Sequence, residues 1–151
     1  MRSIDLLTMS ATIYGEARGT SQVDREDIAH VILNRFKDGP DWMKSQRGDG
    51  IPDFTIEAVC RDPWQFSCWN MNDPNYPKLK RLMKTPLKAL ENERFLECLE
   101  AALRAFNGRG QKRVGKSLHY HAKSMNFPSA WGTPVEPYRD NGFHLFYEGI
   151  K

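Results

Sequence analysis

The sequence lacks most of the features that mark membrane, secreted or disulfide-bonded proteins. No segment approaches the ~18 consecutive apolar residues that a membrane-spanning helix needs. The N-terminus has neither the apolar region nor the small-residue cleavage site of a secretory signal peptide. The three cysteines, Cys60, Cys68 and Cys98, have no Cys-x-x-Cys spacing, which favours reduced thiols. We therefore expect cytoplasmic synthesis and no stable association with a membrane.

What the chain does contain fits one globular domain over residues 1–151. Hydrophobic residues make up 40% of the 151 positions and aromatic residues 11%, which is enough for a core. The net charge of +3 is too small to select one partner among nucleic acid, anionic wall polymers and other polyanions. The densest basic run, over residues 109–116, is expected to be a solvated loop. We expect a monomer with no nucleic-acid partner.

The first candidate for chemistry is residues 14–19, with the sequence YGEARG. An apolar period before it predicts a helix that is capped by Ser3 or Asp5 and ends at Gly19. Glu16 then falls in the last turn, where the helix dipole and the unpaired carbonyl groups disfavour a second negative charge. This position predicts a raised pKa for Glu16, more so with partial burial. Glycosidic bond cleavage requires a carboxylic acid of this kind, although the same position also suits an ordinary surface glutamate.

Two helices are predicted between this motif and the middle of the chain. Ser21 opens the first with a sequence that resembles a capping box, in which Asp24 takes the place of the usual Glu or Gln. Near the end of this helix, Arg35 is expected to join an ion pair or face solvent, with a place near a cleft as the alternative. Residues 55–60 predict the second helix, which Pro63 stops.

Residues 64–69, with the sequence WQFSCW, predict a strand or an extended loop because polar and apolar residues alternate. The alternation would place Gln65, Ser67 and Trp69 on one side. Amide and hydroxyl groups beside aromatic rings suit sugar binding. A packed hairpin edge is the alternative interpretation.

The following residues predict helices that build the core. A short helix is expected over residues 78–84. From Asn92, an apolar stripe over residues 95–106 predicts a central core helix that ends at Gly108. We assign no chemistry to this helix.

Two alternating segments near the C-terminus predict strands. Residues 117–122 place His119 and His121 on one face of a strand and Tyr120 on the other. Residues 142–147 form the second strand, and we expect the two segments to pair as a hairpin. The whole chain therefore predicts an α+β fold in which helices dominate.

Six motifs occur in order along nearly the whole chain. Each is weak alone, but together they resemble the SleB-like cell-wall hydrolase family, whose best-known members are spore-cortex-lytic enzymes. The first motif is the most specific. The six are residues 14–19 (YGEARG), 32–35 (ILNR), 65–69 (QFSCW), 118–121 (LHYH), 128–131 (PSAW) and 144–147 (HLFY).

The resemblance implies a mostly helical, lysozyme-like domain with a small antiparallel sheet that lines the cleft. It also implies cleavage of the peptidoglycan strand between N-acetylmuramic acid (MurNAc) and N-acetylglucosamine (GlcNAc). By motif, Glu16 corresponds to the catalytic residue of the family. The residues that would contact the glycan are Tyr14, Gln65, Ser67, Tyr120, His121, Trp131 and His144.

The chain departs from the resemblance in two respects. Residues 119–123 (HYHAK) stand where the family usually has a Tyr-Phe-Tyr-Asn-Pro type of stretch, which affects the sugar contacts. Spore enzymes of this type often carry a secretion signal and a wall-binding domain, and neither is seen. We therefore expect a phage or prophage endolysin, which waits in the cytoplasm until a separate pore-forming protein lets it reach the wall.

A lytic transglycosylase is the first hypothesis, because it needs one carboxylic acid and neither a cofactor nor a metal. Glu16 would protonate the glycosidic oxygen and later accept the proton of the MurNAc 6-hydroxyl as a 1,6-anhydro ring forms. A muramidase, which hydrolyses the same bond, is the alternative and would normally use a second carboxylate. The candidates for that carboxylate are Asp24, Asp62, Asp73 and Asp140, which the sequence places at caps or turns.

Two further hypotheses use other features of the chain. A zinc-dependent amidase would bind its metal through His119, His121 and His144, since alternation puts the first two rings on one face. A non-catalytic module that binds the wall or nucleic acid would fit the weakly basic charge and the aromatic residues. Glu16 chemistry is our main prediction, because the helix-end motif fits catalysis better.

Overall fold

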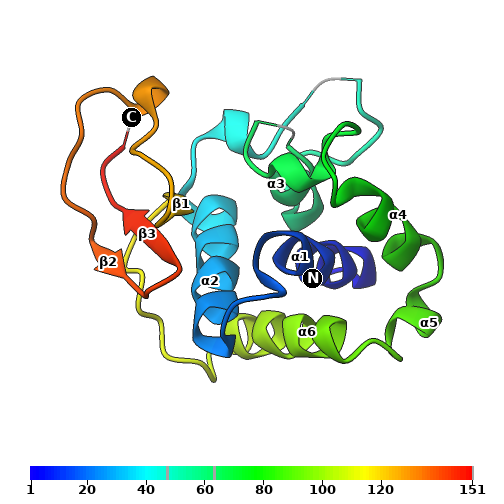
Figure 1. The fold of residues 1–151 in the computed structure, drawn as a ribbon. Helices are drawn as coiled ribbons and strands as arrows, with labels where there is room; N and C mark the ends of the chain where they lie inside the picture. Colours follow the sequence, from blue (N-terminus) through cyan, green and yellow to red (C-terminus); the bar gives the residue numbers. More distant parts are fainter. Residues whose placement is uncertain (47, 63, 151) are drawn as a thin grey trace.

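Six α-helices and a small sheet make up the computed structural model, which describes residues 1–46, 48–62 and 64–150 (Figure 1). The α-helices are α1 (Ser3–Ala17), α2 (Gln22–Asp38), α3 (Ile56–Arg61), α4 (Tyr76–Lys84), α5 (Pro86–Ala89) and α6 (Glu93–Phe106). Short 3-10 helices are η1 (Asp41–Met43), η2 (Ser67–Trp69) and η3 (Ser129–Trp131). The strands are β1 (His119–Ala122), β2 (Arg139–Asp140) and β3 (His144–Tyr147).

Helix α1 begins and ends one or two residues away from the predicted caps. Arg2 is the N-cap residue, and its backbone N–H donates to the carboxylate of Asp5 at 3.0 Å, so neither Ser3 nor Asp5 is itself the cap. The helix ends at Ala17, with Gly19 in the turn that follows. The prediction that Glu16 lies in the last turn is confirmed.

Helix α2 is buried along most of its length. In Figure 1 it stands between the sheet on one side and α1 on the other, and α6 also packs against it. All residues from Asp24 to Arg35 are buried, including four charged side chains before Ile28. A helix covered on both sides must satisfy its charged groups inside the protein. The predicted cap is confirmed, since the Ser21 hydroxyl accepts a hydrogen bond from the Asp24 backbone at 3.1 Å.

Helix α6 is amphipathic rather than central. It begins after Asn92, as the sequence predicts, and the Asn92 side chain caps it by accepting a hydrogen bond from Phe95 N–H. It packs on α1 and α2 through a face of small residues and Phe95. Leu96, Leu103 and Phe106 are 42%, 37% and 44% exposed, so this part of the predicted core stripe faces outward. The predicted core helix is therefore confirmed for the face that carries Phe95 and Ala102 and is wrong for the three residues that face outward.

The sheet has the antiparallel order β1-β3-β2, and β1 pairs with β3 as predicted. Tyr120 lies opposite Phe146, so these two side chains share one face with His144. We call this the inner face, because it is turned toward the helices. The outer face carries His119, His121 and the other alternate residues. The short strand β2, which the sequence did not predict, pairs with β3 at Arg139 and Asp140.

Residues 64–69 are not a strand. Trp64 and Gln65 form a turn that the Asp62 side chain supports by accepting the Trp64 N–H at 2.9 Å, and η2 follows. The alternation fails to give a strand because no neighbouring strand pairs with it in the described part of the chain. Pro63, the predicted helix stop, lies outside the described residues.

The architecture confirms the α+β, predominantly helical fold that the resemblance implies for a lysozyme-like domain. Its core is one continuous cluster that joins α1, α2, α6 and the inner face of the sheet. Among the described residues, no helix is both long and apolar enough to span a membrane. The sheet and the C-terminal end of α1 thus lie on either side of α2. This arrangement sets the position of the candidate site.

Candidate active site

Glu16 lies where the last turn of α1 meets η2. A Cβ atom placed on the preceding Gly15 would come within 2.8 Å of the Cys68 Cβ and 2.9 Å of its Sγ. Only glycine allows so close an approach, which explains why the residue before Glu16 is a glycine. The contact places the Cys68 thiol beside the Glu16 carboxyl, where it acts to lower the pKa of that group.

The pKa of Glu16 is raised from 4.5 to about 7, which agrees in direction with the sequence prediction. Burial is the largest cause, whereas the sequence argument placed the end of the helix first. The positive charges of His144 and Arg35 act in the opposite direction, and the negative charge of Asp73 adds to the rise. Glu16 can therefore hold a proton near neutral pH and still be ionised readily.

Arg35 is buried, 3% exposed, and does not face solvent. Its Nε donates to the carbonyl oxygen of Leu118 at 2.7 Å, and its guanidinium lies 4.7 Å from the centre of the Phe66 ring. Its Nη1 is buried without a partner among the described residues. This places a fixed positive charge close enough to Glu16 to lower its pKa, which agrees with the cleft alternative and not with a solvent-facing side chain.

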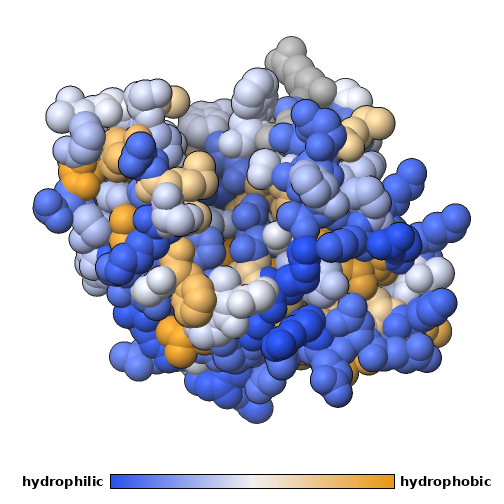
Figure 2. Space-filling view, in the orientation of Figure 1, coloured by the Kyte–Doolittle hydropathy of each residue, from blue (hydrophilic) through white to orange (hydrophobic). Residues whose placement is uncertain are grey.

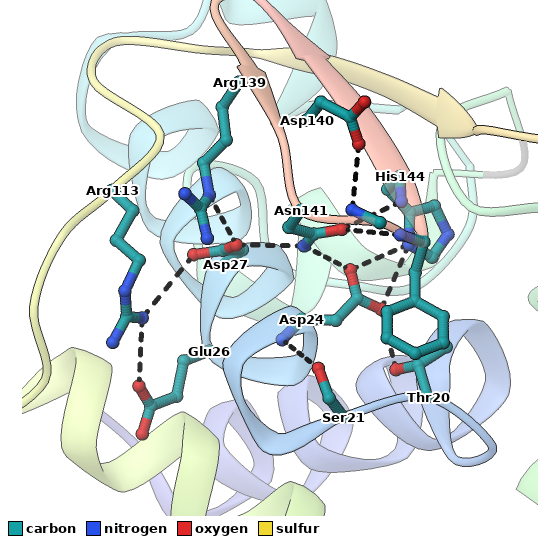
Figure 3. Close-up of polar contacts among 12 residues, drawn as sticks. Thr20, Ser21, Asp24, Glu26, Asp27, Arg113, Arg139, Asp140, Asn141 and His144 are labelled. Atoms are coloured by element: carbon teal, nitrogen blue, oxygen red, sulfur yellow. Dashed lines mark hydrogen bonds and ion pairs between the residues drawn. The ribbon is translucent and has the colours of Figure 1, made fainter.

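Asp24 binds His144 across the gap between α2 and β3 (Figure 3). The His144 Nδ1 donates to the Asp24 carboxylate at 2.8 Å, and Asp24 is fully buried. Thr20 and Asn141 also donate to this carboxylate, each at 2.7 Å. Since a carboxylate accepts, Nδ1 of His144 carries the proton in this contact. Asp24 therefore orients His144 and is not the capping-box acceptor that the sequence suggested.

A second set of buried charges fastens the sheet to α2. Asp27, which is fully buried, accepts from Arg139 Nε at 2.9 Å and from Asn141 Nδ2 at 2.9 Å. Arg113 lies between Asp27 and Glu26, at 3.8 Å and 3.4 Å (Figure 3). Because Asn141 donates to both Asp24 and Asp27, it connects this anchor to the His144 site.

Tyr120 completes the inner face beside His144. Its ring centre lies 5.2 Å from that of His144 in an edge-on arrangement, and 6.5 Å from that of Phe66. The pKa of Tyr120 is raised well above its usual value, mainly by burial and then by the charge of Glu16. Of the predicted site residues, the structure brings Glu16, Tyr120 and His144 together.

Gln65 and Ser67 lie at the start of η2, next to the Cys68 that contacts Glu16. Ser67 is exposed and Gln65 is half-buried, so both side chains are accessible from solvent. Trp69, by contrast, is buried and donates its Nε1–H to the Thr12 hydroxyl at 2.9 Å. The predicted common side for Gln65, Ser67 and Trp69 is therefore wrong, because η2 turns Trp69 into the core.

His121 and Trp131 lie on the outer face, away from Glu16. His121 stacks on Tyr147 with ring centres 5.4 Å apart, and Trp131 lies 5.9 Å from His121. Both nitrogens of His121 are used, since Nδ1 donates to the Ala122 carbonyl and Nε2 bonds the Tyr147 hydroxyl, each at 2.8 Å. A role for His121 and Trp131 in glycan binding stays a prediction and would need a glycan that reaches around the sheet.

The three histidines of the zinc hypothesis do not form one ligand set. His144 points to the inner face, whereas His119 and His121 point to the outer face of the same sheet. His119 lies against Trp131 at 5.1 Å, and burial lowers its pKa to about 4. Within the described part of the chain, no group of three or more His, Cys, Asp or Glu side chains is arranged to hold a metal ion.

Tyr14 lies on another side of α1 from Glu16. Two helical positions separate them, which turns their side chains about 200° apart. Tyr14 packs edge-on against Phe95 at 6.5 Å and lies under the Arg18 guanidinium at 5.1 Å. The structure does not bring this predicted glycan contact to the Glu16 site.

The four candidate second carboxylates are not equivalent. Asp24 is enclosed by its donors, and Asp62 is buried and accepts from the Trp64 backbone. Asp140 is exposed and pairs with Lys123 at 2.8 Å. Asp73 is half-buried, and its charge acts on Glu16 while one oxygen accepts from the Asn75 backbone at 2.8 Å. Asp73 is thus the candidate with both access to solvent and influence on Glu16.

The sequence analysis missed the connections of Asp24, Asn141 and Cys68. The capping-box pattern gave Asp24 a local role and hid its partner 120 residues away. Asn141 precedes Gly142, which reads simply as a turn. The three thiols are free, as expected from their spacing, and buried, but nothing in the sequence indicated that Cys68 contacts α1.

Comparison with known proteins agrees with the resemblance. The model of the cell wall hydrolase family matches residues 19–147. The match includes Asp24, Arg35, Tyr120 and His144, whereas Glu16 lies just before its first position. No curated protein and no solved structure matches the chain significantly. Since the family model covers far more than half of the 151 residues, the chain belongs to the cell wall hydrolase family.

Proposed function

We propose that this peptidoglycan-degrading enzyme is a lytic transglycosylase that cleaves the MurNAc–GlcNAc bond with Glu16 as its acid and base. The observation that carries the proposal is the environment of Glu16, a carboxyl with a pKa of about 7 beside His144, Arg35 and Tyr120. At pH 7, a group with this pKa is protonated in about half of the molecules. One residue can therefore give a proton and take it back.

The proposed reaction needs no water. Glu16 donates its proton to the glycosidic oxygen, and the bond from MurNAc C1 to that oxygen breaks with its electron pair going to the leaving GlcNAc. The oxocarbenium-like centre at C1 is attacked by the 6-hydroxyl of the same MurNAc. The C1–O6 bond forms, and the 6-hydroxyl proton returns to the Glu16 carboxylate, which restores the enzyme.

The neighbours of Glu16 stabilise its carboxylate form, which exists after the proton has been donated. The positive charges of Arg35 and His144 lower its pKa, so they stabilise the carboxylate that exists after the proton has left. Asp24 keeps His144 in place through the 2.8 Å hydrogen bond and so acts as a positioning residue. Tyr120 lines the same side and is neutral at any ordinary pH, because its pKa is raised.

A muramidase is the second candidate, and Asp73 is the observation that favours it. This carboxylate acts on the pKa of Glu16 and keeps partial exposure, so a water molecule could bind between the two groups. Inverting glycosidases place a base carboxylate across from the acid for this purpose. Asp73→Asn would then abolish hydrolysis, whereas a transglycosylase would keep its activity.

Product analysis separates the two reactions. Purified sacculi are digested with the enzyme, and the muropeptides are examined by mass spectrometry before and after borohydride reduction. A transglycosylase gives 1,6-anhydroMurNAc ends, which are lighter by one water than hydrolysis products and resist reduction. Reducing MurNAc ends would establish a muramidase, and intact glycan with freed stem peptides would overturn the role of Glu16.

A further inference from the structure

Two short segments of the chain, residues 78–88 and the basic loop over residues 109–116, are rich in Lys and Arg. Residues 78–88, which form most of α4 and α5, contain five Lys and Arg residues and no acidic residue. The whole chain has a net charge of +3, so the residues outside this segment together carry a net charge of −2. The weakly basic average therefore conceals a strongly basic region at residues 78–88, besides the basic loop.

Four of these five cations line a hollow of about 800 Å³ on the side of the molecule away from the sheet. Figure 2 shows strongly hydrophilic side chains gathered on the side where Figure 1 places α4 and α5. We call this region the basic hollow. Its lining consists of Tyr14, Lys78, Arg81, Leu82, Lys84, Thr85, Lys88, Ala89, Glu91 and Asn92.

The cations of the basic hollow are not used by the fold. None of Lys78, Lys80, Arg81, Lys84 and Lys88 forms an ion pair with a carboxylate among the described residues. By contrast, the buried carboxylates of α2 form ion pairs with arginines from other segments. Four like charges around one concavity repel one another, and a bound polyanion would relieve that repulsion.

The basic hollow is separate from the Glu16 site but shares helix α1 with it. Tyr14 forms part of its wall, and Glu16 points to another side of the same helix. A ligand in the hollow would not occupy the site of bond cleavage. It would hold the enzyme beside the glycan instead.

The chemistry of the hollow suits a chain of phosphate groups with hydroxyls between them. Lys and Arg side chains are the usual phosphate ligands in proteins. Thr85 and Asn92 add polar groups for hydroxyl contacts, while Glu91 is the one carboxylate in the lining. Several cations along two consecutive helices match a polymer with repeated charges better than a single small anion.

Nucleic acid fits this hollow less well. Single-stranded nucleic acid is held by bases that stack on exposed aromatic rings. Tyr14 is the only aromatic side chain of the lining, and it already contacts Phe95 edge-on and the Arg18 guanidinium over its face. No ring is therefore free for stacking.

We propose that the basic hollow binds the phosphodiester backbone of an anionic polymer attached to the cell wall. The inference rests on the proposed function, because that function places the enzyme on the wall. Wall polymers built from polyol phosphates carry both the repeated charge and the hydroxyl groups that the lining matches. Binding would concentrate the enzyme on its substrate and would weaken as salt screens the charges.

The test uses poly(glycerol phosphate) as the probe and two variants with equal charge loss. In the first variant, Lys78→Gln, Arg81→Gln and Lys84→Gln remove cations from the basic hollow. In the matched control, Arg109→Gln, Lys112→Gln and Lys116→Gln remove the same charge from the basic loop. Affinity is measured at several salt concentrations for the wild type and both variants, after circular dichroism has checked the folds.

We expect the hollow variant to bind the probe about tenfold more weakly at low salt, with a flatter salt dependence, and the control to lose about threefold or less. Equal losses in both variants would mean that only net charge matters and would overturn the inference. Tighter binding of the wild type to single-stranded DNA, or to anionic lipid vesicles, at matched charge would overturn it as well.

Sacculi stripped of anionic polymers separate this inference from the proposed function. Both triple variants should cleave stripped sacculi at the wild-type rate, because neither touches the Glu16 site. The hollow variant alone should be slower on sacculi that keep their phosphate polymers. Failure of the wild type on stripped sacculi would count against the proposed function and leave the binding measurement to be judged by itself.

Discussion

The two faces of one three-stranded sheet differ in what they do with histidine. On the inner face, His144 is bound to the buried carboxylate of Asp24 and its charge acts on Glu16. On the outer face, His121 is stacked on Tyr147, and His119 has a buried Nδ1 without a partner among the described residues. Residues that alternate along the same strands thus divide between an electrostatic site and an aromatic cluster. The side chain's neighbours, and not its type, decide whether a histidine acts on Glu16.

The largest expected effect on the cleavage rate comes from substitution of Glu16, whose pKa is influenced by residues of the inner face. Glu16→Gln keeps the size of the side chain but has no proton to donate, so cleavage of sacculi should fall roughly 10²–10⁴-fold. Binding of the glycan should persist. The matched control is Asp38→Asn, which changes an exposed carboxyl at the end of α2 and should leave the rate unchanged. Lysis by Glu16→Gln at the wild-type rate would remove the basis of the assignment.

The next largest effect is expected on stability, from removal of the carboxylate that holds His144 on the inner face. Asp24→Ala leaves the buried donors of His144, Asn141 and Thr20 without their acceptor, and should lower the free energy of unfolding by about 3 kcal/mol. Urea denaturation measures the change. Asp140→Ala is the control on the same sheet, because its ion pair is exposed and should contribute little to the free energy of unfolding. Equal losses of unfolding free energy in the two variants would mean that the contact with His144 stabilises the protein no more than an exposed ion pair does.

Glu16 should also make the protein less stable at high pH. Its pKa in the folded protein, about 7, lies above the ordinary 4.5, so the folded state holds the proton more tightly than the unfolded state. Stability is therefore full below pH 4.5 and declines as pH rises through 7. Glu16→Gln should exceed the wild type by about 2 kcal/mol at pH 8, less than the whole shift implies because the side chain keeps some exposure. At pH 4 the two should unfold alike.

A pair of histidine variants sharpens the comparison of the two faces. His144→Gln removes a positive charge that lowers the pKa of Glu16, so the fall of activity at high pH should move to higher pH. His119→Gln, on the outer face, should leave the fall of activity at the same pH as in the wild type. Rate profiles from pH 5 to about 9 on a soluble glycan test both. A shift of the same size in both variants would contradict the division between the faces.

The smallest effect is expected on the outer face. Tyr147→Phe removes the hydroxyl that bonds His121 Nε2 at 2.8 Å and should lower the free energy of unfolding by about 1 kcal/mol. The rate of glycan cleavage should not change. Tyr138→Phe, at an exposed position, serves as the control for removing a hydroxyl. A large loss of activity in Tyr147→Phe alone would move the outer face into the glycan-binding site.

Features that depend on neighbouring residues were predictable from the sequence. The last turn of α1 holds Glu16, Ser21 caps α2, and Asn92 caps α6 through the Phe95 N–H at 3.2 Å. Local hydrogen bonds and a helical period determine each of these. The pairing of β1 with β3 was also predictable, because two short alternating segments lie close together near one end of the chain.

Features that depend on distant partners were not predictable. Asp24 matches a local capping pattern, yet its carboxylate is taken by His144, which lies 120 positions later. Residues 64–69 alternate like a strand, but an Asx-type turn at Asp62 and the hydrogen bond of Trp69 to Thr12 fold them into η2. The sequence pattern contains no information about which remote side chain will compete for a group, so tertiary contacts decided both cases.

The long separation between Asp24 and His144 has a consequence for how the protein is made. Glu16 and Asp24 leave the ribosome well before β3, because His144 follows Asp24 by 120 positions. Contacts between such remote segments form late in folding, because a long loop must close first. A nascent or truncated chain without β3 would lack the inner face and should be unable to cut glycan. Cleavage of glycan would thus begin only after β3 has been synthesised and has joined α2.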